Sequence, residues 1–200
     1  NPDIFQSVFY SNHYIWENDF IPEQKLYTGF KFAIPELFFT LSAQNSFIQN
    51  YIYLYSPNGS DLEVRQKDVY LNVSSVTAEK VFKFKNLSLT NKLIWQNSTD
   101  PNVLSLPLIA LYQSTYFILK PVDDVIFHFG ADVYFSTTYK ISSFNPAVGQ
   151  FYFENDSESL TGSYPFVSAF ANIKIKKNVM LYFRYSNLAS FFQNFEVHTD

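Results

Sequence analysis

The 200-residue sequence has no cysteine, only five glycines, and few charged side chains, which make up 16% of it. Without cysteine the chain has no disulfide, no thiolate metal site and no cysteine nucleophile. Fourteen basic residues against eighteen acidic ones leave a net charge of −4. A nucleic-acid-binding protein normally carries a basic surface patch, so the charge balance argues against a nucleic-acid partner.

Aromatic residues are abundant instead and make up 20% of the chain. This much apolar surface can offset the entropy lost on ordering, which argues against a disordered chain. The mean hydropathy of −0.08 resembles that of a soluble protein. A β-strand with one apolar and one polar face averages to such a value, so the index does not exclude a membrane β-barrel.

Apolar and polar residues alternate along several segments, which is the period of a strand with two different faces. In 125–136 the first face holds Val125, Phe127, Phe129, Ala131, Val133 and Phe135, and the second holds His128, Gly130, Asp132, Tyr134 and Ser136. The same alternation occurs in 37–43, 87–98, 167–175 and 181–186. The sequence therefore predicts an all-β fold.

About nine strands are predicted, at 5–17, 25–34, 36–55, 66–82, 84–98, 107–119, 124–140, 164–176 and 178–190. Several of them exceed the roughly 9–11 residues with which a tilted strand crosses a bilayer. Their length favours a membrane protein over a globular domain, whose strands usually have about 5–6 residues.

The connections between these strands alternate in length. Short turns are expected at 35–36, 85–86, 120–124 and 177–178, and long polar connections at 17–24, 56–65, 99–106 and 141–163. This rhythm is typical of an antiparallel up-and-down transmembrane β-barrel with short turns at one end and long loops at the other. A sandwich with Greek-key connections has no reason to keep it.

In a membrane barrel the apolar face of each strand meets lipid and the polar face lines a water-filled lumen. The pore-lining residues predicted on this basis are Lys31, Lys92, His128, Asp132, Lys174 and Arg184. Tyrosine and tryptophan near the predicted strand ends suit interfacial aromatic girdles. These residues are Tyr10, Tyr14, Trp16, Tyr51, Tyr53, Tyr55, Trp95, Tyr139 and Tyr164. In a soluble sandwich the same alternation would have its faces reversed.

No constellation in the sequence indicates catalysis. His128, Asp132 and Ser136 share one face of one strand, but residues four apart on a strand are about 13 Å apart, too far for a triad. The three histidines, at 13, 128 and 198, lack the spacing of metal ligands. We therefore expect no catalytic residue, no metal site and no cofactor.

Three segments resemble the C-terminal part of the putative-porin family of Bacteroidota outer membranes. They are GADVYFSTTY at 130–139, NPAVGQFY at 145–152 and GSYPFVSAFANIKIKK at 162–177. The residues that carry the resemblance are Asn145, Pro146, Gly149, Gln150, Phe151, Tyr164, Pro165 and Asn172. Family members tend to have a histidine and an asparagine where this chain has Asn187 and Ala189, and the final strand of the family is absent. The resemblance implies a β-barrel of the Gram-negative outer membrane that passes small solutes.

The sequence thus leads to two expectations about function. In the first, residues 1–200 are a fragment of a single outer-membrane β-barrel domain that lacks its closing strand. It would contact membrane lipid, conduct small hydrophilic solutes by diffusion and carry out no enzymatic reaction. In the second, the chain is a soluble or surface-exposed β-sandwich that binds glycans through exposed aromatic side chains.

Overall fold

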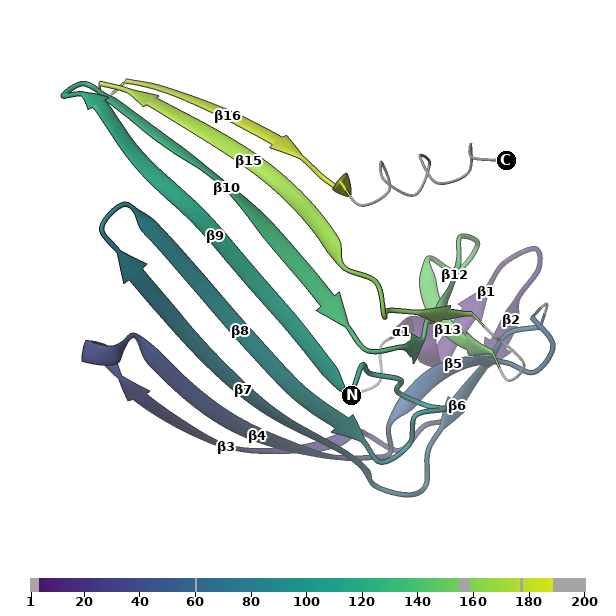
Figure 1. Ribbon diagram of the computed structural model, residues 1–200. Helices are drawn as coiled ribbons and strands as arrows, with labels where there is room; N and C mark the ends of the chain where they lie inside the picture. The colour runs from purple at the N-terminus through teal and green to yellow at the C-terminus, as the bar shows by residue number, and fades with distance from the viewer. Residues whose placement is uncertain (1–3, 60, 155–158, 177, 189–200) are drawn as a thin grey trace, which may run out of the picture.

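A computed structural model describes residues 4–59, 61–154, 159–176 and 178–188. Its main element is an eight-stranded sheet in the order β16-β15-β10-β9-β8-β7-β4-β3. The strands are β3 (Gln24–Ile34), β4 (Phe39–Gln49), β7 (Leu71–Phe84), β8 (Leu87–Ser98), β9 (Ile109–Val122), β10 (Val125–Ser136), β15 (Phe166–Ile175) and β16 (Val179–Tyr185). All neighbouring strands are antiparallel, and the sheet is bent into an open trough (Figure 1). The predicted fold class, all-β with antiparallel up-and-down strands, is confirmed.

Short turns join the strands at one end of the trough. The 3-10 turn η1 (Pro35–Leu37) ends at Phe38, which has a left-handed φ of 48°. Two-residue turns at 85–86 and 123–124 join β7 to β8 and β9 to β10. The long connections all lie at the other end (Figure 1), so the predicted rhythm of short and long connections is confirmed.

The long connections contain ordered structure of their own. Within them, β5 (Ile52–Ser56), β6 (Glu63–Gln66), β12 (Ser143–Asn145) and β13 (Gln150–Glu154) form a four-stranded sheet. The preceding segment adds α1 (Ile4–Ser7) and the hairpin β1 (Val8–Tyr10) and β2 (Ile15–Glu17), and β11 (Tyr139–Lys140) pairs with β14 (Leu160–Thr161). We call the four-stranded sheet and the β1–β2 hairpin the end module. No helix in the described part of the chain is long and apolar enough to cross a membrane.

The end module has a small hydrophobic core. Its buried residues are Ile52, Leu54 and Val64. Packed against them are Trp16, Phe20, Leu62, Val148 and Tyr152. These residues come from the N-terminal segment and from two different connections of the large sheet, so burial of their side chains holds three distant parts of the chain together.

Two predicted strands are corrected by the structure. The sequence predicts one strand over 5–17, but the segment forms α1 and the β1–β2 hairpin. The amide of Ser11 donates to the carbonyl of Tyr14 at 2.9 Å and closes the turn of this hairpin. Segment 36–55 divides at Asn50, which has a left-handed φ of 58° that asparagine tolerates better than most residues. The described part of the large sheet therefore has eight strands rather than nine, and the end of the last predicted strand, 189–190, lies outside the described residues.

The two faces of the eight-stranded sheet differ sharply in chemistry. Within its strands every buried residue lies on one face, namely Ser46, Ile48, Leu71, Ser88, Ser98, Ser114, Asp132 and Ser168. Side chains converge on the concave side of a curved sheet and shield one another, so we assign this mainly polar face to the inside of the trough. The other face carries exposed large apolar side chains, among them Phe30, Phe32, Phe82, Leu93, Phe117, Phe129, Leu181 and Phe183.

The apolar face has a few polar positions. Thr28, Asn45, Ser74 and Asn97 are cross-strand neighbours and form a row over four strands. Of the predicted girdle residues, Trp95 lies on this face and is 42% exposed. Six others lie outside the large sheet, in or beside the end module, namely Tyr10, Tyr14, Trp16, Tyr51, Tyr53 and Tyr55.

Candidate pore-lining surface

The strand register places all six predicted pore-lining residues on the concave polar face. They are Lys31, Lys92, His128, Asp132, Lys174 and Arg184. The prediction succeeds because side chains point to alternate faces along a strand. Residues that alternate with the apolar side chains therefore all lie on the opposite face. Neither Lys31 nor Lys174 lies near Asp132, so the six residues form a surface rather than a single cluster.

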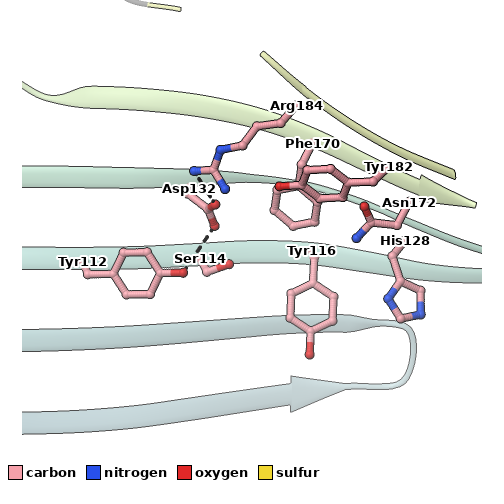
Figure 2. Close-up of a pocket in the computed structure, with 9 residues that line it drawn as sticks. All are labelled: Tyr112, Ser114, Tyr116, His128, Asp132, Phe170, Asn172, Tyr182 and Arg184. Atoms are coloured by element: carbon pink, nitrogen blue, oxygen red, sulfur yellow. Dashed lines mark hydrogen bonds and ion pairs between the residues drawn. The ribbon is translucent and has the colours of Figure 1, made fainter. Parts of the chain in front are cut away.

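Asp132 and Arg184 form an ion pair across the polar face. A guanidinium nitrogen (Nη2) of Arg184 lies 3.1 Å from Oδ2 of Asp132, and the hydroxyl of Tyr112 donates to Oδ1 at 3.4 Å (Figure 2). Arg184 lies on β16 and Asp132 on β10, so the arginine reaches past the intervening strand β15. The neighbour of Asp132 on β15 is the small residue Ser168, which leaves room for this contact.

Burial differs between the two partners of this pair. The side chain of Asp132 is 7% exposed, whereas that of Arg184 is 33% exposed. A carboxylate buried without a partner is costly, and a guanidinium with a hydrogen-bonding hydroxyl offsets that cost. The negative charge is therefore neutralised inside the wall, while part of the guanidinium remains open to the inside of the trough.

The pair borders a shallow cavity of about 320 Å³. Its lining also includes Tyr116 and His128, whose rings are stacked with centroids 6.2 Å apart. Asn172, the cross-strand neighbour of His128, has a buried amide oxygen for which the described residues provide no hydrogen-bond donor. The lining is thus polar and aromatic, with fixed donors and one compensated charge.

A second cavity, of about 610 Å³, contains Lys92. Tyr112 lines both cavities, and its ring lies 4.8 Å from that of Tyr134. Tyr164 also lines this second cavity. Lys92 itself lies between Glu79 on β7 and Tyr112 on β9 in the strand register.

The residues of the resemblance do not form one site. Asn145 and Gly149 shape the turn between β12 and β13. The side-chain carbonyl of Asn145 accepts the amide of Ala147 at 2.9 Å, its side-chain nitrogen donates to the hydroxyl of Tyr14 at 3.0 Å, and Gly149 has a φ of +69°. Asn145 therefore ties the longest connection to the N-terminal hairpin.

The other residues of the resemblance are spread over three places. Pro146 follows Asn145 in the same turn, and Gln150 and Phe151 begin β13, where Phe151 is 66% exposed. Tyr164 and Pro165 precede β15, and Asn172 lies within it. Only Tyr164 and Asn172 face the cavities of the large sheet.

Residue-by-residue reasoning missed several residues that line the first cavity. Tyr112, Ser114 and Tyr116 come from β9, Phe170 from β15 and Tyr182 from β16. The alternation of faces along a strand indicates these residues too. Tyr182 lies two positions from Arg184 and so shares its face, and Tyr112, Ser114 and Tyr116 are alternate residues of β9 that share one face. As expected, His128, Asp132 and Ser136 share one face.

The arrangement offers fixed charges and hydrogen-bonding groups on a curved wall. Among the described residues no group of three or more metal-binding side chains occurs. Figure 2 shows Tyr112 and Tyr116 of β9, and Tyr182 and Arg184 of β16, over one shared surface. Such a surface can attract or repel dissolved solutes and can exchange hydrogen bonds with them.

A family described as putative porin matches residues 1–198, nearly the whole chain. Neither a curated protein nor a solved structure matches the sequence. The large sheet has one apolar and one polar face, as expected of such a protein. Because the match covers nearly the whole chain, the chain belongs to the putative-porin family.

Proposed function

We propose that the chain is part of an outer-membrane β-barrel through which small hydrophilic solutes diffuse. The observation that carries the proposal is the segregation of side chains on the eight-stranded sheet. Its convex face exposes large apolar residues such as Phe129, at 40%, whereas its concave face buries Asp132 at 5%. Apolar residues outside and polar residues inside are the arrangement of a barrel with a water-filled lumen.

Membership of the putative-porin family supports the same proposal. The strands also have suitable lengths, since seven of the eight have ten residues or more and about 9–11 suffice to cross a bilayer when tilted. The polar face would contact solute through charges and hydroxyl groups held in place by the wall. Transport of this kind needs no catalytic residue and no cofactor.

A glycan-binding β-sandwich receives less support. A sandwich buries the apolar faces of two sheets against each other, but the described residues form one large sheet whose apolar face is uncovered. Phe30, Phe117 and Phe183 on that face are all more than 40% exposed. In water such a surface would promote aggregation, whereas in a bilayer it is the surface that lipid requires.

The proposal is tested by placing an arginine on either face of β10. Phe129→Arg should cost about 2–4 kcal/mol if residue 129 faces lipid near the middle of the bilayer. The control is His128→Arg, one position away on the polar face, which should be tolerated. Folding of the native protein is followed by the faster migration of unheated samples on SDS gels, since an intact barrel resists the detergent.

Conductance supplies the second readout. The wild-type protein should form channels in planar bilayers, and Asp132→Asn should fold normally while changing the conductance. The assignment of the faces would be reversed if Phe129→Arg folded and His128→Arg did not. Identical migration of heated and unheated samples, together with an absence of channels, would contradict the proposed function.

A further inference from the structure

Charge is distributed very unevenly between the large sheet and the rest of the chain. The eight strands contain eight basic and two acidic residues, whereas the remaining sequence contains six basic and sixteen acidic ones. The chain as a whole has a net charge of −4, so a basic sheet is not explained by composition. The two acidic residues of the strands are Glu79 and Asp132.

The basic residues of the strands also gather on one face. The strand register gives the position of seven of the eight, and six of these lie on the polar concave face, namely Lys25, Lys31, Lys83, Lys92, Lys174 and Arg184. Lys120 lies at the register shift between β9 and β10. The exception among the seven, Lys80, lies near the short-turn end of the apolar face, where its ammonium group donates to the carbonyl of Leu37. Long basic side chains at the edge of an apolar belt extend towards water in this way.

Both acidic residues of the strands have basic neighbours. Asp132 is 5% exposed and paired with Arg184. Glu79 lies directly opposite Lys92 in the register of β7 and β8. On β3, Lys25 is paired with Glu23 at 2.8 Å. The uncompensated charge on the polar face is therefore positive, and it comes from Lys31, Lys83 and Lys174.

In the described part of the chain, the other acidic residues lie outside the eight strands. In the connections and the end module, Glu63 pairs with Arg65 at 2.7 Å and Asp100 with Lys67 at 2.5 Å. At physiological ionic strength the field of a charge decays over about 8 Å. Away from the strand ends, the field inside the trough is consequently set by the residues on the strands themselves.

From this distribution we infer that the polar face selects small hydrophilic anions, such as inorganic anions and small carboxylates, over cations. The inference rests on the proposed function and names its class of solute. Charged side chains that line a narrow pore set ion preference because they act on the ion at short range. Local positive charge also raises the concentration of anions at the wall.

The test is the reversal potential of the native protein in a planar bilayer with a tenfold gradient of KCl. We expect its sign to show a preference for chloride, and the preference to weaken at 1 M KCl, where the screening length falls to about 3 Å. The double substitution Lys31→Glu and Lys92→Glu should shift the reversal potential towards the potassium side. If that protein folds poorly, Lys31→Gln with Lys92→Gln should give a smaller shift in the same direction.

The matched control is Lys80→Gln, which removes a lysine from β7 on the opposite face and should leave the reversal potential unchanged. A channel that prefers potassium, or a preference unaffected by both double substitutions, would overturn the anion inference and leave the channel function intact. An SDS-resistant protein that never conducts would overturn the proposed function and the inference with it.

Discussion

Gly130 lies in the middle of β10, where the backbone of β9 approaches closely. A Cβ atom added there would lie 2.1 Å from the carbonyl oxygen of Thr115 and 2.7 Å from Cβ of Tyr116. Glycine inside a strand often marks such a close approach. The residue therefore lets β9 and β10 approach closely beside the stacked rings of Tyr116 and His128.

We predict that Gly130→Ala destabilises the sheet by about 1–3 kcal/mol, the usual cost of forcing an extra methyl group into a closely packed site. The measurement is the fraction of protein that folds into the SDS-resistant form. Gly29→Ala is the control, because a Cβ at residue 29 would lie 3.4 Å from its nearest neighbour, an ordinary contact. Equal folding of the two variants would show that the close approach at Gly130 is unimportant.

A second prediction at this scale concerns the ion pair on the polar face. Arg184→Gln leaves the buried carboxylate of Asp132 with only the hydroxyl of Tyr112 as a partner. We expect a loss of about 1–3 kcal/mol in the free energy of unfolding, less than for a fully buried pair because Arg184 is one-third exposed. Urea titration of protein folded into lipid vesicles measures it.

The double variant Arg184→Gln and Asp132→Asn provides the control for that experiment. Removing both charges also removes the unpaired carboxylate, so much of the lost stability should return. If the double variant were as unstable as the sum of the two single variants, Asp132 and Arg184 would not act as a pair.

At the scale of elements, the end module depends on a very small core. Leu54 is 5% exposed and packs with Ile52 and Val64. Truncating a buried leucine to alanine costs about 2–5 kcal/mol, so Leu54→Ala should open the module while the large sheet persists. Limited proteolysis should then cleave within 52–66 at an increased rate.

Phe151→Ala serves as the comparison, because that side chain belongs to the same small sheet but is 66% exposed. It should leave the rate of cleavage nearly unchanged. Resistance of both variants to protease would mean that the module is held in place by contacts other than its apolar core.

Two long connections are joined by the ion pair between Lys67 and Asp100. The ammonium group of Lys67 lies 2.5 Å from Oδ2 of Asp100, and this hydrogen bond lowers the pKa of Asp100 below its ordinary value of 3.8. A lowered pKa in the folded state means that the carboxylate stabilises the fold above pH 3.8 and that this contribution disappears as the pH falls through the folded-state pKa.

We therefore predict that the connections at 67–70 and 99–108 separate more readily in strong acid. Amide exchange of these segments, measured at pH 5 and then below pH 3.8 with correction for the intrinsic rate, should show the loss of protection. In Asp100→Asn the two corrected values should agree. The pair is partly exposed, with 19% and 25% of the two side chains accessible, so we expect a modest effect.

The sequence predicts elements well where the alternation is long. Seven of the eight long strands contain ten residues or more, and each offers several consecutive matches to a period of two. The end module offers no such signal because its strands have three to five residues. Its parallel pairing of Tyr55 with Phe153 joins two connections that are far apart in the chain, which local patterns cannot indicate.

For the candidate site, the sequence predicts the face on which a residue lies but not the contacts between residues of different strands. A period of two is enough to place Lys92 or His128 on the polar face, and no knowledge of strand neighbours is needed. The contact between Asp132 and Arg184 requires the order β10-β15-β16 and the register of two strand pairs. It also requires the curvature of the sheet, which lets a side chain reach past a strand.

At the scale of the whole molecule, the two edge strands of the trough leave backbone hydrogen-bonding groups unpaired within the described sheet. Among the described strands, β3 pairs only with β4 and β16 pairs only with β15. The outer edge of each strand therefore carries backbone amides and carbonyls without a partner in the sheet. In hydrocarbon each such group costs several kcal/mol, so a membrane location requires both edges to be paired.

This requirement gives a prediction that separates a membrane barrel from a free-standing sheet. In the native protein embedded in vesicles, the amides of β3 and β16 should exchange with deuterium as slowly as those of β9, which has a neighbour on each side. If both edges exchanged quickly while β9 stayed protected, the sheet would have open edges facing water. Since open edges do not occur in the hydrocarbon region, that result would contradict the proposed location in the membrane, whatever the chemistry of the two faces.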